Sequence, residues 1–312
     1  MRSQRINVLG SVNADHVIQT PSLPRPGETV SGNNYRIIPG GKGANQAVAC
    51  ARLSKDAGDI SFIACVGDDG FGRETIDRMS QLGMDTQAIT AVPGKATGVA
   101  LIAVDSNAEN CITIAPEANA YLNQDMVSQH QNLISAGHTL LMQLETPVEG
   151  LQAAAETAKN SGTRVVLNPA PARQLPASLL SKVDIITPNQ TEAELLSGIA
   201  VHDQNSAHQA AQALHRHGIS TVVITMGSQG AWISERGQGQ MVSGFHVSPV
   251  DTTAAGDTFN GALVVALAEG KSLVDAVTFA NAAGAISVTR PGAQPSIPTR
   301  KEVEDCLASQ DS

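Results

Sequence analysis

The chain has 312 residues, 42% hydrophobic and only 3% aromatic, so we expect one large α/β domain or two smaller ones with an aliphatic core. Its formal net charge of −9 argues against nucleic acid or an anionic membrane as a partner, but still allows a small anion held by local N–H groups. No apolar run is as long as the roughly 18 residues of a membrane span, and the start lacks a signal-peptide core, so we expect a cytoplasmic protein.

Short apolar runs alternate with longer helical patterns along most of the chain. Continuous apolar runs are typical of parallel strands covered on both faces, and their alternation with helices predicts a doubly wound, mostly parallel α/β sheet. Strands are expected at 6–10, 60–66, 139–144, 164–169, 183–188 and 221–226. Helices are expected at 43–54, 71–82, 147–160, 191–197 and 206–217. Two more should follow residue 256, the second beginning at Ser272 with Asp275 at the spacing of a capping box.

Two regions interrupt this alternation. Residues 12–38 and 95–115 contain short β-like pieces separated by turns, with no long helix between them. We expect them to form a small β-sheet at one edge of the main sheet. Because no linker, repeat or low-complexity tract divides the chain, residues 1–312 are expected to form a single domain that carries this small sheet.

Polar or glycine-rich stretches follow the six expected strands. Ligands of open α/β sheets bind beyond the carboxyl ends of the strands, so these stretches are candidates for a site. In chain order they are GSVNAD, GDDGFG, ETP, NPAPAR, PNQTE and GSQG. The topology alone predicts such a cluster, and the cluster does not yet identify a chemistry.

A first glycine-rich motif, GGKGANQAVA, occupies residues 40–49. It is not a P-loop, because no glycine stands five residues before Gly41 and Gly43 stands where the motif needs Ser or Thr. Close approach of a ligand to the backbone, with Lys42 and Asn45 as donors, and a plain turn into a packed helix explain it equally well. The motif GDDGFG at 67–72 lacks dinucleotide-binding spacing and is interpreted as a turn and a helix start.

A second motif, DTTAAGDTFNG, occupies residues 251–261. A helix N-terminus offers free N–H groups and about half a positive charge, and the small residues 254–256 leave room for an anion there. Asp257 could be a simple N-cap, which is worth about 1 kcal/mol. Capping does not explain the small residues before it or the second acid, Asp251.

Together these motifs resemble the PfkB family of carbohydrate kinases, and within it the kinases that act on ribose, over about residues 5–300. Two family signatures read GGKGANQAVACARL (40–53) and DTTAAGDTFNGAL (251–263). Between and beyond them VNADHV, TGVAL, MQLETP, NPAPAR, PNQTEAEL, TMGSQG and TRPGAQPSIP stand in the family's order. The resemblance implies transfer of the γ-phosphoryl group of ATP to the 5-hydroxyl of ribose, a reaction that depends on positioning and charge stabilisation.

The resemblance also implies roles for individual residues. Asp257 matches the base that accepts the hydroxyl proton, and the amides of Ala254, Ala255 and Gly256 match an anion hole. With Asp257, the sugar-binding positions are Asn13, Asp15, Gly41, Lys42, Asn45 and Glu145. The ATP-binding positions are Asn189, Thr225, Gly227, Gly230, Gly256 and Asn281, the last of which is commonly histidine in the kinases that act on ribose.

Two ions and a second copy of the chain complete what the resemblance implies. Glu192 matches a position near magnesium, which it would hold through water. A monovalent cation, usually potassium, would be held by Asp251, by the carbonyls of Thr253, Ser287, Arg290 and Gly292, and by the hydroxyl of Ser296. Segments 12–38 and 95–115 match a lid over the sugar, whose exposed face pairs in homodimers.

Several alternatives remain at this point. A kinase for deoxyribose, fructose or a nucleoside would share the fold. An adenosine site would want a more aromatic lining than the eight aromatic residues of this chain favour. A non-catalytic sensor is disfavoured by the intact motif at 254–257, and a Rossmann dehydrogenase by GSVNAD in place of GxGxxG after the first strand.

Overall fold

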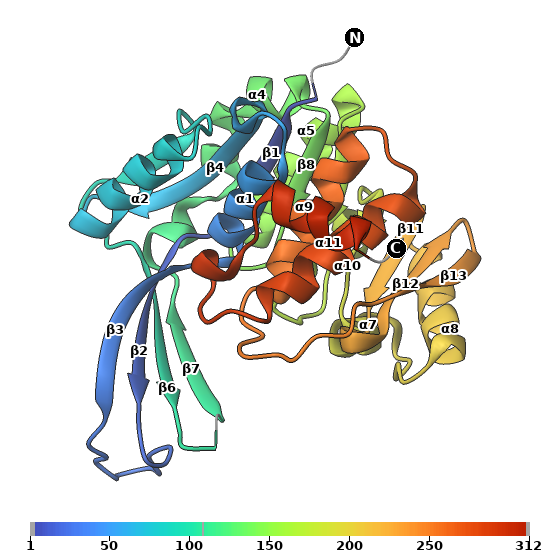
Figure 1. Ribbon diagram of the computed structural model, residues 1–312. Coiled ribbons are helices and arrows are strands. Elements are labelled where there is room, and N and C mark those ends of the chain that lie inside the picture. Colours follow the sequence, from blue (N-terminus) through green and yellow to red (C-terminus); the bar gives the residue numbers. More distant parts are fainter. Residues whose placement is uncertain (1–3, 108, 310–312) are drawn as a thin grey trace.

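The computed structural model describes residues 4–107 and 109–309, and these form two sheets (Figure 1). The larger sheet has nine strands in the order β13-β12-β11-β10-β9-β8-β1-β4-β5. Neighbours from β11 to β5 are parallel, whereas β12 is antiparallel to both β11 and β13. Its strands are β1 (Ile6–Leu9), β4 (Ile60–Gly67), β5 (Ile89–Val92), β8 (Thr139–Met142), β9 (Arg164–Leu167), β10 (Ile185–Ile186), β11 (Thr221–Thr225), β12 (Gly230–Glu235) and β13 (Gln238–Ser243).

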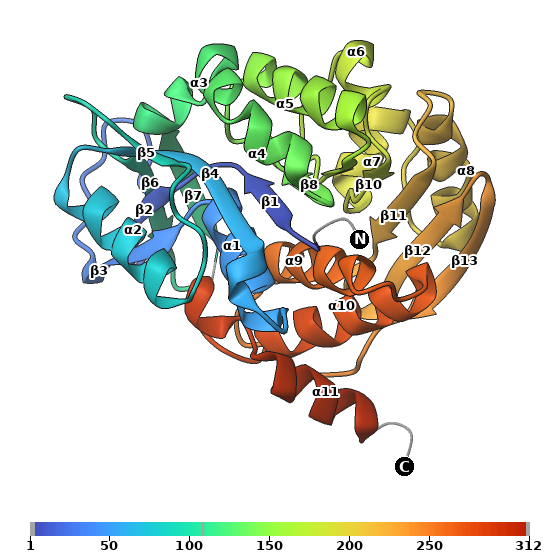
Figure 2. The ribbon, with the colours of Figure 1, turned by 90° about the horizontal axis from the view of Figure 1, so that it is seen from above.

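Helices cover both faces of the larger sheet (Figure 2). Successive strand residues point to opposite faces, so Val8 packs into one buried cluster and Leu9 into the other. The first cluster includes side chains from α1 (Lys42–Leu53), α2 (Gly70–Gln81), α9 (Ala255–Ala268), α10 (Leu273–Ser287) and α11 (Arg300–Ala308). The second includes side chains from α3 (Gln124–Gln129), α4 (Gln131–Ala136), α5 (Val148–Ser161), α6 (Ala177–Leu180), α7 (Gln190–Ser197) and α8 (Gln204–His215). The doubly wound fold is therefore confirmed.

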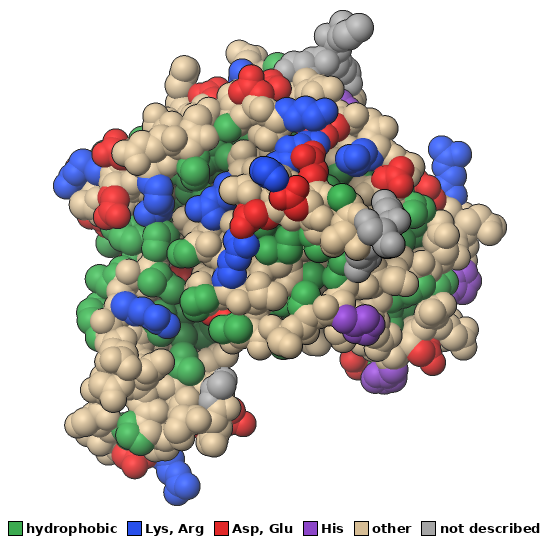
Figure 3. All heavy atoms as spheres, viewed as in Figure 1, with side chains coloured by type: hydrophobic (Ala, Val, Ile, Leu, Met, Phe, Trp, Pro, Cys, Tyr) green, Lys and Arg blue, Asp and Glu red, His purple; other side chains and the backbone are tan. Residues whose placement is uncertain are grey.

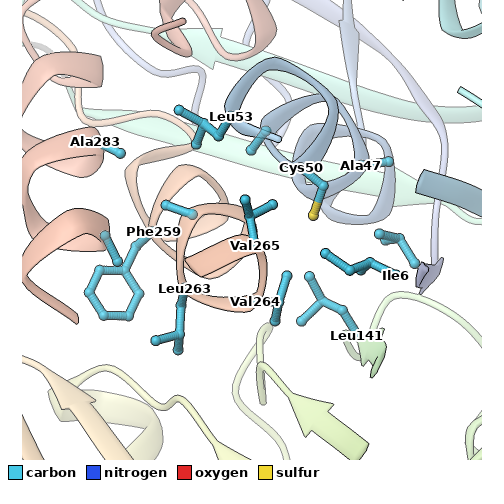
Figure 4. Close-up of a cluster of buried hydrophobic side chains, with 14 of the residues drawn as sticks. Ile6, Ala47, Cys50, Leu53, Leu141, Phe259, Leu263, Val264, Val265 and Ala283 are labelled. Carbon is cyan, nitrogen blue, oxygen red and sulfur yellow. The ribbon is translucent and has the colours of Figure 1, made fainter. Parts of the chain in front are cut away.

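Helices α1 and α9 lie against each other on one face of the sheet, with Leu53 and Val265 among the buried side chains between them (Figure 4). A Cβ atom on Gly261 would lie only 2.4 Å from the Cβ of Ala49, so this close contact requires glycine. Because both helices start at the carboxyl edge of the sheet, their packing brings the first turn of each to the same place.

The small sheet has the strand order β3-β2-β6-β7 and projects from the body of the molecule (Figures 1 and 3). Its strands are β2 (Asn13–Gln19), β3 (Asn33–Gly40), β6 (Gly98–Val104) and β7 (Asn110–Ala115). Tyr35, Ile37 and Leu101 are exposed on one face, and Ile112 and Ile114 on the face that also carries Asp15. Both faces of the small sheet therefore present apolar side chains to solvent.

The predicted elements differ from the observed ones mainly in length and number. The predicted strand 183–188 is reduced to Ile185–Ile186, followed shortly by Pro188, which has no N–H for a ladder. Strand β5 and the hairpin β12–β13 were not predicted, because β13 is a mostly polar edge strand with one buried side chain, Val242. A third helix, α11, follows the two expected after residue 256.

The expected start of α10 is partly right. Ser272 accepts a hydrogen bond from the backbone N–H of Asp275, as in a capping box. The Asp275 carboxylate accepts from the Ser272 hydroxyl at 2.7 Å instead of reaching back to the backbone. Separately, none of the helices in the described part of the chain combines the length and the apolar character needed to cross a membrane.

Candidate active site

The residues predicted to form a site meet at the carboxyl edge of the larger sheet. Two neighbouring cavities lie there, of about 360 and about 200 Å³, and they share Thr225, Thr252, Ala255 and Gly256 in their linings. A more open hollow of about 680 Å³ lies at the amino edge of the sheet, and none of the predicted site residues lines it. The site therefore occupies the edge at which ligands of open α/β sheets bind.

The start of α9 forms the boundary between the two cavities. Its N-cap is Ala254, which has the left-handed φ of 60° at a cost of about 1 kcal/mol for a residue with a Cβ. Among the described residues, no acceptor receives the N–H groups of Gly256 and Asp257, whereas Ala255 N–H donates to the Thr252 carbonyl at 3.3 Å. A Cβ on Gly256 would meet no atom within 4 Å. The helix therefore opens two free donors toward empty space.

Asp257 is the third residue of α9 and is only 6% exposed. The alternative that it is the N-cap is wrong, because its carboxylate turns away from the helix backbone. Its two oxygens accept from the side-chain amides of Asn45 and Gln46, each at 2.9 Å. Burial raises the pKa of Asp257, whereas Lys42 and these two amides oppose the rise.

Lys42 lies at the start of α1 among four carboxylates. Burial lowers the pKa of its ammonium group, but Asp257, Glu145, Glu192 and Asp15 outweigh burial and raise it above the ordinary value. Lys42 is therefore a half-buried cation at neutral pH. It also lines the smaller cavity, together with Asn189 and Gly256.

The predicted sugar-binding residues near Lys42 come from three parts of the fold: the end of β8, the start of β2 and the start of α1. Glu145 follows β8 and accepts from the Ser11 hydroxyl at 2.6 Å and from the Lys42 backbone N–H at 3.0 Å. Asn13 begins β2 and accepts from Asn119 at 2.8 Å. Gly41 has φ of 89°, and a Cβ there would lie 2.8 Å from the Asn13 amide.

Asp15 lies on the face of the small sheet that looks toward this group. Burial, followed by repulsion from Glu145 and Asp257, raises its pKa to about 7, even though Lys42 acts in the opposite direction. Lys42, Asp257 and Glu145 are thus close enough to Asp15 to change its ionisation. Carboxylates, an ammonium group and amides arranged in this way suit a ligand with several hydroxyl groups.

The larger cavity has an apolar lining. Phe245, Val247, Pro249 and Phe259 line it, none of which was predicted, together with the predicted residues Thr225, Gly227, Gly230, Gly256 and Asn281. The Asn281 amide nitrogen donates to the carbonyls of Val242 and Ser243 at 3.2 and 3.1 Å, and so ties α10 to β13. Phe245, Val247 and Pro249 lie in the loop after β13, a strand that the sequence did not reveal, whereas Phe259 belongs to α9.

Asn189 and Glu192 form a capping box at the start of α7, as a plain helix start would. Glu192 Oε2 accepts from the Asn189 backbone N–H at 2.9 Å, while the residue also lines the smaller cavity. Burial raises the pKa of Glu192. Within residues 4–107 and 109–309, no group of three or more His, Cys, Asp or Glu side chains could enclose a metal.

The predicted monovalent-cation residues come from two adjacent loops. The Asp251 carboxylate accepts from the backbone N–H groups of Thr253 at 2.9 Å and Gly292 at 2.8 Å, and so joins the two loops. Burial alone would raise the pKa of Asp251, but these hydrogen bonds lower it below its ordinary value. The Ser296 hydroxyl donates to the Ala293 carbonyl at 2.7 Å. The predicted ligands are one carboxylate and several carbonyl and hydroxyl oxygens, and such oxygen ligands fit a large cation of single charge.

Sequence reasoning missed a group of buried amides behind Asp257. Gln46, Gln143, Asn168 and Asn260 are all at most 6% exposed. Asn168 belongs to the NPAPAR stretch at a strand end, which was a usable signal. Gln46 gave no such signal. It lies inside a helix one position after Asn45, and adjacent helix positions do not normally share a face.

Comparisons with known proteins agree with this geometry. The family model described as pfkB family carbohydrate kinase matches residues 3–300. A ribokinase from Haemophilus influenzae is 51% identical, over 97% of this chain and 98% of its own. A deoxyribokinase from Salmonella typhi is 35% identical, over 97% and 98% of the two chains. The solved structure of Arabidopsis thaliana ribokinase complexed with ribose and ATP superposes with a TM-score of 0.91 at 32% identity, over 97% and 98%.

Proposed function

The chain belongs to the pfkB family of carbohydrate kinases, and we propose that it transfers the γ-phosphoryl group of ATP to the 5-hydroxyl of D-ribose. The products are ribose 5-phosphate and ADP, and one proton is released from the hydroxyl. One observation carries the proposal: the buried carboxylate of Asp257 lies one residue beyond the open N-terminus of α9, between the predicted sugar residues and the two cavities.

We propose that the sugar lies between β2 and the start of α1. Asn13, Asp15, Gly41, Lys42, Asn45 and Glu145 would bind its hydroxyl groups, and Asp257 would receive the attacking one. A carboxylate accepts the hydroxyl proton as the new P–O bond forms, since it is too weak a base to remove that proton beforehand. Lys42 would balance negative charge between the carboxylates and the incoming phosphate.

ATP would occupy the two joined cavities. The apolar walls of the larger one, including Phe245 and Phe259, suit a purine base, with Thr225, Gly227, Gly230 and Asn281 around it. The phosphates would extend past Asn189 into the smaller cavity, toward the free N–H groups at the start of α9. Those donors and the helix dipole stabilise the charge that develops on the transferred group.

Two ions are part of the proposal. Magnesium, held by the phosphates and through water by Glu192, neutralises phosphate charge when bound. Potassium would lie between the loops of 251–253 and 287–296, where Asp251 and the predicted carbonyls and hydroxyl are. There it would keep the loop before α9 in its strained conformation. The chain would act in the cytoplasm, in keeping with the composition.

We also propose that the small sheet is a lid and a dimer interface. It carries Asp15 over the sugar site, and the apolar side chains exposed on its other face, such as Leu101 and Ile37, suit contact with a second copy. A closed lid excludes water, which would otherwise accept the phosphoryl group. Residues 1–312 would form one domain that includes this lid.

The test is a panel of sugars with Mg-ATP, scored by ADP release and by the mass and position of the phosphorylated product. We expect ribose to give the highest kcat/KM, and 2-deoxyribose, fructose and adenosine lower values. The deoxyribokinase relative makes 2-deoxyribose the sharpest competitor. A higher kcat/KM for it would replace ribose as the substrate, and no ADP release with any sugar would refute the kinase assignment.

A further inference from the structure

Gln46 contacts Asp257 from the protein side. Its residue exposure is 0%, whereas Asn45, the other amide on Asp257, belongs to the predicted sugar site. The two amides take different oxygens: Gln46 Nε2 donates to Oδ1 and Asn45 Nδ2 to Oδ2. A sugar hydroxyl can therefore replace Asn45 at Oδ2 while Gln46 keeps Oδ1.

Gln46 itself is held in place by two further buried amides. Its second N–H donates to Asn168 Oδ1 at 3.0 Å, and its carbonyl oxygen accepts from Gln143 Nε2 at 2.6 Å. Gly10 makes room for Gln143, since a Cβ there would lie 2.0 Å from Gln143 Oε1. Each polar atom of the Gln46 side chain thus has a partner, and the amide has one orientation.

The same chain of hydrogen bonds continues to the start of α9. Asn168 Nδ2 donates to the Thr187 carbonyl at 3.1 Å, the Thr187 hydroxyl to Asn260 Oδ1 at 2.6 Å, and Asn260 Nδ2 to the Gly256 carbonyl at 2.8 Å. Gly256 and Asp257, the two residues closest to the reaction, are thereby braced by one continuous network. The side chains of this network come from α1, from the residues that follow β9 and β10, and from α9 itself.

The direction of this network favours one protonation state of Asp257. Two N–H donors point at its carboxylate, and both bonds need an acceptor, which an ionised carboxylate supplies on each oxygen. If the Gln46 amide turned over, its oxygen would face the carboxylate and its NH₂ group would face the NH₂ group of Gln143. Its oxygen would also face Asn168 Oδ1, whose position is set because Asn168 Nδ2 donates to the Thr187 carbonyl. Asn168, together with Gln143, therefore fixes the orientation of Gln46, and Gln46 favours the ionised form of Asp257.

We propose that Gln46 is a positioning residue for Asp257, held by Gln143 and Asn168, that keeps the carboxylate ionised and turns its Oδ2 toward the sugar hydroxyl. The inference rests on the proposed role of Asp257 as the proton acceptor. It extends that role to a residue that touches neither sugar nor nucleotide in the proposed arrangement.

Other charges also act on Asp257, and the test must separate them from Gln46. Lys42 from α1 favours the ionised carboxylate, whereas Glu145 after β8, Asp15 from β2 and Glu192 from α7 disfavour it. None of these groups is altered by a change at Gln46 or Gln143. A shift in the pH profile of such a variant therefore reports the lost hydrogen bond and not a changed charge.

The decisive variant is Gln46→Met, which keeps the length of the side chain and removes the amide. We expect kcat to fall by about ten- to a hundredfold, because a hydrogen bond to a charged group is lost. KM for ATP should change by less than about twofold, since the nucleotide does not touch Gln46. The acid limb of the kcat profile should move up by about one pH unit, as loss of a donor to the carboxylate raises its pKa.

Gln143→Met tests the same network one residue further away and should move kcat and the acid limb in the same direction by a smaller amount. Gln81→Met is the matched control, because Gln81 is exposed at the end of α2, and it should leave both unchanged. Thermal unfolding of every variant identifies loss of fold. If Gln46→Met does not fold, Gln143→Met carries the test.

Three outcomes are distinguishable. A folded Gln46→Met or Gln143→Met enzyme whose pH profile matches the wild type overturns the positioning role, even if KM for the sugar rises. If Asp257→Asn retains turnover, the proposed function of Asp257 fails instead, and Gln46 has nothing to position. An inactive Asp257→Asn beside a shifted Gln46→Met profile supports both.

Discussion

The start of α9 and the small sheet face each other across the proposed sugar site, and they are built in opposite ways. Asp257 is buried, hydrogen-bonded on both oxygens and backed by two packed helices. The small sheet has four strands and exposed apolar side chains on both faces, and it projects away from the helices of the body. The first region is organised before any ligand binds, whereas the second gains its missing contacts only from a ligand or a second chain.

This contrast suits the proposed reaction. Groups that stabilise a transition state lower the barrier most when they need no rearrangement at the moment of reaction. A cover over the substrate must open and close, so it is drawn from a part of the molecule with few buried contacts. Four predictions test the contrast, from the largest expected effect to the smallest.

The largest effect is expected from Asp257→Asn at the preorganised side. The change keeps the shape of the side chain and removes the proton acceptor, so kcat should fall by about a thousandfold or more. Affinity for the sugar, measured by calorimetry, should change little. Asp77→Asn, at an exposed position on α2, serves as the control. Turnover within tenfold of the wild type would show that another group accepts the proton.

A smaller effect is expected at the small sheet. Leu101 is 56% and Ile37 49% exposed, and both lie on the face away from Asp15. If these side chains pair two chains, the double variant Leu101→Asp with Ile37→Asp should sediment as a monomer, because buried charges cost several kcal/mol. We expect kcat/KM for the sugar to fall about tenfold, mostly through KM, since an unpaired lid covers the sugar less well.

The control for this experiment is Val274→Asp, which places the same charge at an exposed apolar position on α10. It should leave both the mass and the kinetics unchanged. A wild-type protein that already sediments as a monomer with full activity would remove the dimer from the proposal, and with it the reason for the exposed apolar faces.

A substitution at Asp251 tests whether the loop before α9 needs a bound potassium ion to keep its conformation. Asp251→Asn keeps a hydrogen-bond acceptor for Gly292 or Thr253 but removes the charge that would attract potassium. We expect activation by potassium, relative to tetramethylammonium, to be lost and turnover to fall by about tenfold at saturating substrates, because the loop would be steadied less well. Equal activity of the wild type in both salts would mean that the loop holds its strained conformation unaided.

The smallest effect concerns Asp15, where the small sheet meets the site. Its pKa in the folded protein is raised from 3.8 to about 7. Protonated Asp15 therefore contributes stability that is fully present below pH 3.8 and is lost as pH rises through about 7. Relative to the wild type, Asp15→Asn should become progressively more stable between these pH values and then reach a plateau.

Thermal unfolding of the ligand-free proteins across this range checks the prediction. Asp77→Asn again supplies the control and should show no such trend, because Asp77 is exposed. A constant difference between Asp15→Asn and the wild type at all pH values would mean that Asp15 is not desolvated by the small sheet, and that the sheet lies further from the site in solution.

Local patterns in the sequence predicted the strand–helix alternation, the carboxyl-edge location of the site and the open helix start before Asp257. The patterns are apolar runs for strands, polar stretches where strands end, and small residues before a helix. The roles of the single site residues were implied by the resemblance to the PfkB family and stay predictions. The hairpin β12–β13 was not predicted, because β13 is a mostly polar edge strand and has no apolar run. The loop after β13, which supplies Phe245 and Val247 to the larger cavity, was therefore not predicted either.

Only the tertiary structure decided which buried groups support Asp257. These groups come from segments up to 214 residues apart, and no spacing along the chain predicts that they touch. They are Gln46, Gln143, Asn168 and Asn260. The sequence places Asp257 beside a helix start, where capping would have been sufficient. The packing of α1 on α9, made possible by Gly261, instead turns the carboxylate toward two amides. A side chain's partner is a long-range property, and here it separates a cap from a candidate base.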